Sequence, residues 1–86
     1  MNARERLKNH IAINYLQGDA TGLDDATALL DLKIIDSVAI YDLLHYIRTE
    51  LGVGVPMDEI SPTNFASIAN IVAMVDRLRA RERRSS

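Results

Sequence analysis

The sequence contains no cysteine and no tryptophan, and it has no long uninterrupted apolar run. Without cysteine the chain has no disulfide, no thiolate metal site and no cysteine nucleophile of its own, so its stability depends on packing and we expect a cytoplasmic protein. The longest run without a charged residue, 60–75, contains serine, threonine, asparagine and proline. A membrane-spanning helix needs about 20 mostly apolar residues. We therefore expect no membrane span, and we expect the N-terminal segment to start a helix rather than a signal peptide.

The motifs of common enzyme classes are also missing. The two histidines, His10 and His45, lie on different predicted helices without H-x-x-x-H spacing, so we expect no metal site formed by both. No phosphate-binding loop is present, because Gly52 and Gly54 suit the end of a helix and no lysine follows them. A chain of 86 residues buries only about 60% of the surface that it exposes when unfolded, which leaves no room for a deep pocket. We predict that the protein is not an enzyme.

Charge is distributed unevenly along a chain whose formal net charge is −2. The middle, 19–59, holds nine acidic and two basic residues, whereas 76–86 holds five arginines and two acids. An acidic centre repels phosphate backbones, so we expect no nucleic-acid binding, and it attracts partners with basic patches. The basic tail, 81–86, is expected to be a solvated, frayed helix end. The alternative for the arginines of 77–84 is a role in docking to a partner or to a membrane surface.

Apolar periodicity predicts an all-α fold with one domain, 1–86, whose core covers about 3–80. Three main helices and one short helix are expected, with a long loop between the first two and Asn64 as the N-cap of the last. The loop is too apolar to lie free in water, so it should be pinned to the core. The predicted helices are residues 3–16, 37–51, 57–60 and 65–80. The loop residues expected to anchor it are Leu23, Leu29, Leu30, Leu32, Ile34 and Ile35.

Ser37, at the expected start of the second main helix, allows two interpretations. Serine is a common N-cap, where its hydroxyl satisfies an amide that has no partner within the helix. However, Asp36 precedes it, and the positive end of the helix dipole would stabilise a phosphate ester there by about 0.3–1 kcal/mol. No base lies nearby in sequence to activate the serine as a nucleophile. The site therefore suits a covalently attached phosphate better than catalysis.

Residues 29–38, LLDLKIIDSV, resemble the attachment segment of acyl and peptidyl carrier proteins, in which Asp-Ser and an aliphatic residue begin the second helix. Three further segments resemble the same family in register, so the resemblance covers about 5–79. It implies a four-helix carrier bundle. Many relatives have glycine where this chain has Lys33, which suggests a backbone angle that glycine tolerates. The three further segments are residues 15–19, 51–56 and 61–68.

The resemblance implies a carrier, with 4′-phosphopantetheine attached covalently to Ser37 and Asp36 assisting the attachment. A phosphopantetheinyl transferase would supply the group from coenzyme A, and its thiol would hold cargo as a thioester. The implied partners are this transferase, an acyl- or aminoacyl-loading enzyme, and downstream synthases or transferases. We expect a monomer.

The outer ridge of the second helix is the expected partner-binding face. In the resembling carriers of fatty-acid synthesis this ridge usually bears several acids, whereas here Asp42 is the main one. The ridge is either ordinary helix surface or a mixed apolar and polar docking face. We favour an acyl carrier of a specialised, secondary-metabolite pathway. An aminoacyl carrier of nonribosomal peptide synthesis is the alternative, and an unmodified helical interaction module is the alternative from another class. The ridge residues are Val38, Tyr41, Asp42, His45 and Arg48.

Overall fold

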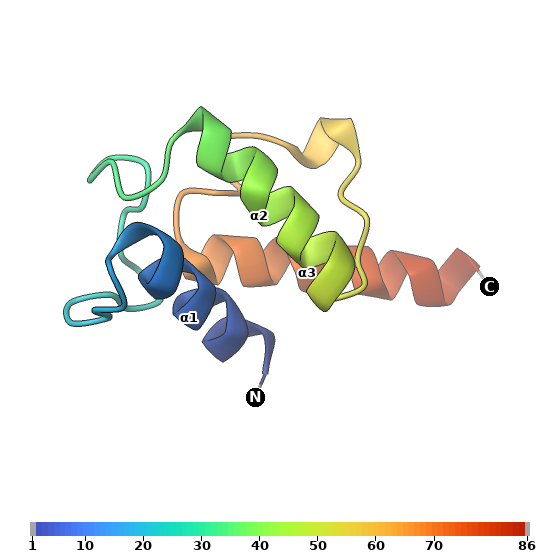
Figure 1. The fold of residues 1–86 in the computed structure, drawn as a ribbon. Coiled ribbons are helices and arrows are strands. Elements are labelled where there is room, and N and C mark those ends of the chain that lie inside the picture. Colours follow the sequence, from blue (N-terminus) through green and yellow to red (C-terminus); the bar gives the residue numbers. More distant parts are fainter. Residues whose placement is uncertain (1, 86) are drawn as a thin grey trace.

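Three α-helices and one short 3-10 helix make up the fold (Figure 1). The computed structural model describes residues 2–85, and the side chains of residues 2–82. Figure 1 shows α2 lying across α3, with α1 beside them and the long loop 16–36 at one end of the molecule. No strand occurs in the described part of the chain, so the predicted all-α class is confirmed. The elements are α1 (Ala3–Tyr15), α2 (Ser37–Glu50), η1 (Met57–Glu59) and α3 (Ile68–Ser85).

The last helix differs from its predicted bounds at both ends. It begins at Ile68, because the Ser67 hydroxyl accepts a hydrogen bond from the Asn70 amide at 3.2 Å, the bond that an N-cap makes. The prediction of Asn64 as N-cap was therefore wrong. Asn64 instead donates from Nδ2 to the carbonyl oxygen of Glu59 at 2.7 Å and so secures the preceding loop. At its other end α3 continues five residues beyond the predicted limit of 80, through most of the tail that was expected to fray.

All three helices and the long loop contribute to one hydrophobic core. The loop is pinned as predicted, because Leu23, Leu29 and Ile35 are buried, whereas Leu32 is 64% exposed and was wrongly expected to anchor. The backbone of Leu29 also makes hydrogen bonds that hold the loop. Its amide donates to the Ala66 carbonyl oxygen at 2.8 Å, and its carbonyl oxygen accepts from the amide of Ile34 at 2.9 Å. The loop is therefore held to the segment before α3 and folded back on itself immediately before α2.

Lys33 has a left-handed backbone conformation, with φ of 59°. Its amide donates to the Leu30 carbonyl oxygen at 3.1 Å, so the chain turns here before it returns to Leu29. A left-handed angle strains a residue with a Cβ atom, and glycine avoids that strain. The resemblance indicated such an angle at this position, and the structure confirms it.

We expect Lys33→Gly to raise the free energy of unfolding by roughly 0.5–1 kcal/mol, because relief of about 1–2 kcal/mol of strain outweighs glycine's conformational entropy of about 0.5–1 kcal/mol. Lys33→Val should lower the free energy of unfolding by about 1 kcal/mol or more, because a β-branched residue is a strong outlier at positive φ. Urea unfolding followed by circular dichroism measures both. A glycine variant less stable than the parent chain would contradict the strain at this turn.

Candidate functional site

Asp36 and Ser37 form the N-terminus of α2. Asp36 has an extended backbone, and its Oδ1 accepts a hydrogen bond from the Ala39 amide at 2.9 Å. Asp36 is therefore the N-cap, and Ser37 is the first residue of the helix. The interpretation of Ser37 as the capping residue is wrong, because the carboxylate before it makes that bond.

The Ser37 side chain is exposed, and its hydroxyl forms no hydrogen bond with the described side chains and backbone of residues 2–82. Buried residues hold the backbone on either side of it, with Ile35 before and Ala39 after. The first amides of a helix have no partner within the helix and lie at the positive end of its dipole. An accessible hydroxyl beside such amides fits a covalently attached phosphate. The geometry therefore presents Ser37 on a rigid base at the surface.

Asp42, the main acid of the ridge, is held by two side chains of α1. Its Oδ2 accepts hydrogen bonds from the Tyr15 hydroxyl at 2.8 Å and from His10 Nε2 at 2.9 Å. The other imidazole nitrogen, Nδ1, lies 3.2 Å from Asn14 Nδ2. The His10 ring also stacks on Tyr46, with centroids 4.1 Å apart. Asp42 therefore connects α2 to α1, which the spacing along either helix did not reveal.

The cluster of His10, Tyr15 and Asp42 shifts two pKa values in opposite directions. The hydrogen bond from His10 holds the pKa of Asp42 below its ordinary value. Burial, followed by the hydrogen bond to Asp42, raises the pKa of Tyr15 from 10.0 to about 12. The folded state therefore favours an ionised Asp42 and a protonated Tyr15.

We predict that this cluster loses its stabilising effect at both ends of the pH scale. Because the pKa of Tyr15 is raised on folding, its contribution is complete below about pH 10 and is lost as pH rises towards 12. Because the pKa of Asp42 is lowered, its contribution is present above about pH 4 and is lost as pH falls through the folded-state value. The melting temperature measured across pH reports both effects. Tyr15→Phe should make the fall in melting temperature above about pH 10 shallower.

Tyr41→Phe is the matched control for this prediction, because Tyr41 is 71% exposed and lies outside the cluster. Tyr41→Phe should leave the fall in melting temperature at alkaline pH unchanged. An equal effect of Tyr15→Phe and Tyr41→Phe would contradict a special role for the Tyr15–Asp42 hydrogen bond.

The other ridge residues remain at the surface of α2. Val38 is 77% exposed, close to Ser37 at the start of the helix. Arg48, in the last turn, forms no hydrogen bond or ion pair with residues 2–82. The structure thus places the ridge residues on one helix but separates Asp42 from the rest, because its carboxylate is engaged by α1.

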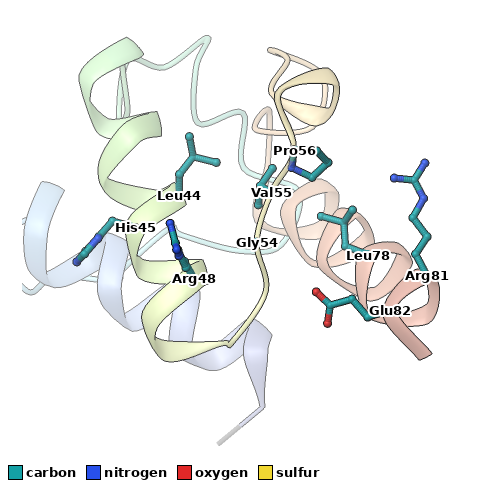
Figure 2. Close-up of a pocket in the computed structure, with 9 residues that line it drawn as sticks. All are labelled: Leu44, His45, Arg48, Gly54, Val55, Pro56, Leu78, Arg81 and Glu82. Carbon is teal, nitrogen blue, oxygen red and sulfur yellow. The ribbon is translucent and has the colours of Figure 1, made fainter. Parts of the chain in front are cut away.

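An open groove lies between the C-terminal half of α2 and the later part of α3, with a volume of about 840 Å³. The segment that follows α2 lines it between the two helices (Figure 2). The groove was not predicted from the sequence, because its walls combine α2 and the segment after it with α3, which lies much later in the chain. Its lining residues are Leu44, His45, Arg48, Gly54, Val55, Pro56, Leu78, Arg81 and Glu82.

Among the described side chains, those of residues 2–82, no group of three or more histidine, aspartate or glutamate residues is placed to hold a metal ion. Within the same range no helix is both long enough and apolar enough to cross a membrane.

Comparison with known proteins decides the family. The family model described as "Phosphopantetheine attachment site" matches residues 12–78, most of the chain. The chain belongs to the phosphopantetheine-binding carrier proteins. It is 48% identical over 75 residues to "Probable acyl carrier protein PigG" of Serratia sp. (strain ATCC 39006), and the alignment covers 87% of this chain and 86% of that protein.

The fold of the carrier is also found among solved structures. A chain in a structure described as "Crystal structure of FAD-dependent dehydrogenase" superimposes with a TM-score of 0.72 and 38% sequence identity, covering 79% of this carrier and 96% of that chain. Because the same alignment covers more of that chain, the matched chain is the shorter of the two. The predicted family, the helical carrier fold and the phosphopantetheine cofactor are therefore confirmed. The protein is an acyl carrier, and this family is not catalytic.

Proposed function

We propose that Ser37 is the residue of this acyl carrier to which phosphopantetheine is attached, and that Asp36 assists the attachment. The observation that carries this proposal is the exposed Ser37 hydroxyl at the N-terminus of α2, which has no hydrogen-bond partner among residues 2–82 because Asp36 makes the cap bond. When bound, the group supplies a thiol that holds acyl cargo as a thioester. The chain has no cysteine and so has no thiol of its own for this purpose.

Asp36 has an oxygen available for the transferase. Only its Oδ1 is engaged, by the Ala39 amide, and the side chain is exposed. The second oxygen can therefore meet a metal ion or a donor of the transferase while the cap stays in place. Because one carboxylate oxygen of Asp36 caps the helix and the other is available, Asp36 can assist the attachment without losing the cap.

The experiment is direct. The full chain is incubated with coenzyme A and a broad-specificity phosphopantetheinyl transferase, and its intact mass is measured. We expect a gain of one phosphopantetheinyl group, and fragmentation should place it on the peptide that contains Ser37. An unchanged mass, or a gain on another peptide, would reject the proposal.

We further propose that the carrier serves a specialised pathway rather than general fatty-acid synthesis. The support is the α2 ridge, where Asp42 is the one acid and its Oδ2 already accepts hydrogen bonds from His10 and Tyr15 of α1. The other exposed ridge residues are Val38, Tyr41, His45 and Arg48. A basic partner surface of the fatty-acid synthesis type therefore finds on this ridge a single carboxylate, partly neutralised by its contacts with α1. A fatty-acid synthase ketosynthase should therefore accept this carrier poorly, and efficient turnover would count against the proposal. Loading by an amino-acid adenylating enzyme in place of acyl donors would favour the aminoacyl alternative.

The structural comparison suggests one class of partner to test. The matched chain is of carrier size and belongs to a structure described by the name of an FAD-dependent dehydrogenase. We propose such a dehydrogenase as a docking partner of this carrier. Binding of the modified chain to that enzyme, measured by calorimetry, should exceed binding of an unrelated helical protein of equal charge.

A further inference from the structure

The groove between α2 and α3 is held open by hydrogen bonds that lie outside its lining. Arg79 donates from its guanidinium to the Leu51 carbonyl oxygen at 2.9 Å, which ties the end of α2 to α3. Arg77 pairs with Glu59 at 3.0 Å, which ties η1 to the same helix. The segment between these two ties therefore lies fixed along α3. A pre-formed groove loses little conformational entropy when a partner binds.

The walls of the groove are apolar at the centre. Figure 2 shows Leu44 of α2 and Val55 facing each other, with Pro56 and Leu78 beyond Val55 on the side of α3. The apolar centre suits one or two aliphatic side chains of a partner segment, because burying them removes apolar surface from water.

The charged residues of the groove give it a positive balance within a protein of net charge −2. Two arginines, Arg48 of α2 and Arg81 of α3, line it with one acid, Glu82. Arg48 has no hydrogen-bond or ion-pair partner among the described side chains, those of residues 2–82, so its guanidinium is available to a docking protein. The acid nearest to it along the ridge, Asp42, is committed to His10 and Tyr15.

We propose that this groove is the docking site for an acidic amphipathic segment of a partner enzyme, with aliphatic side chains against Leu44, Val55 and Leu78 and a carboxylate paired with Arg48. Charge complementarity carries this choice, because guanidinium and carboxylate form strong, directional hydrogen bonds. The site continues the ridge from Ser37 along α2. The inference rests on the proposed function only in taking the partner to be an enzyme that acts on the cargo.

The test uses two matched peptides and the full unmodified chain. Both peptides are about 15 residues long, the length at which isolated helices begin to form. They share one leucine stripe, and its flanks carry glutamates in one peptide and lysines in the other. Backbone amide NMR titration should show the acidic peptide shifting residues 44–48, 54–55 and 78–82 and binding roughly tenfold more tightly than the basic peptide, with a smaller difference at high salt.

Charge variants of the groove make the test specific. Arg48→Glu should weaken binding of the acidic peptide by roughly fivefold or more, and Glu82→Lys should strengthen it. Each has a control with the same change in net charge outside the groove, Lys8→Glu on α1 and Asp76→Lys on α3, and the controls should leave the affinity almost unchanged. Both Arg48 and Glu82 are exposed, so these variants are expected to fold.

Several outcomes would overturn the proposal. They are equal or tighter binding of the basic peptide, no binding of either peptide, shifts confined to other residues, and equal effects of the groove variants and their controls. Self-association of the chain through the same residues, measured by sedimentation, would assign the groove to a second copy. Shifts of the groove amides on loading an acyl chain, without peptide binding, would assign it to cargo. Because the unmodified chain is used, the Ser37→Ala variant should behave identically, and failure here leaves the attachment at Ser37 unaffected.

Discussion

Ser37→Ala should abolish the attachment of phosphopantetheine completely, while the fold stays intact. In the proposed attachment the Ser37 hydroxyl oxygen forms the phosphodiester bond, so no residual rate is expected without it. Alanine is a good helix former at an exposed helical position, and the cap bond belongs to Asp36. The free energy of unfolding should therefore change by no more than about 0.5 kcal/mol. Intact mass after incubation with coenzyme A and transferase measures the first effect, and urea unfolding the second.

Two further variants separate the attachment from other serines and from the cap. Ser61→Ala removes a hydroxyl that accepts a hydrogen bond from the Asn64 amide, and it should leave the mass gain unchanged. Asp36→Asn keeps an N-capping side chain of similar strength but removes its charge. It should slow the attachment without lowering stability. Full-rate attachment to the Asp36→Asn variant would show that the carboxylate only caps the helix.

Leu29→Ala should lower the free energy of unfolding by about 2–5 kcal/mol, which is a large part of the stability of a small domain. Leu29 is completely buried, and its backbone connects the long loop both to Ala66 and to Ile34. Removing its side chain leaves a cavity at the point where the loop is anchored before α2. Leu32→Ala in the same loop is the matched control, because Leu32 is 64% exposed and its loss should change stability by no more than about 0.5 kcal/mol.

Chemical denaturation of the two leucine variants tests this difference. Equal midpoints would mean that the loop is not anchored through Leu29. We also expect faster proteolysis within residues 16–36 of the Leu29→Ala variant under native conditions, because the weakened loop opens locally more often. The mass gain at Ser37 reports whether the anchored loop is needed for attachment.

Local chemistry in the sequence determined the helical class and the position of the site. Apolar spacing gave the three main helices, and the Asp-Ser pair marked the start of α2. Helix ends were less predictable, because a cap depends on which of several nearby polar side chains reaches a free amide. Asp36 and Ser67 reach such amides, whereas Ser37 and Asn64 do not cap.

Tertiary structure alone decided what surrounds the site. His10 and Tyr15 lie far from Asp42 in the sequence, and only the packing of α1 against α2 brings their hydrogen bonds to that carboxylate. The groove likewise needs α2, the segment after it and α3 at fixed positions. Helical periodicity is a property of a few consecutive residues, so it can be read along the chain. Contacts between distant segments depend on how the helices pack, and no local pattern records them.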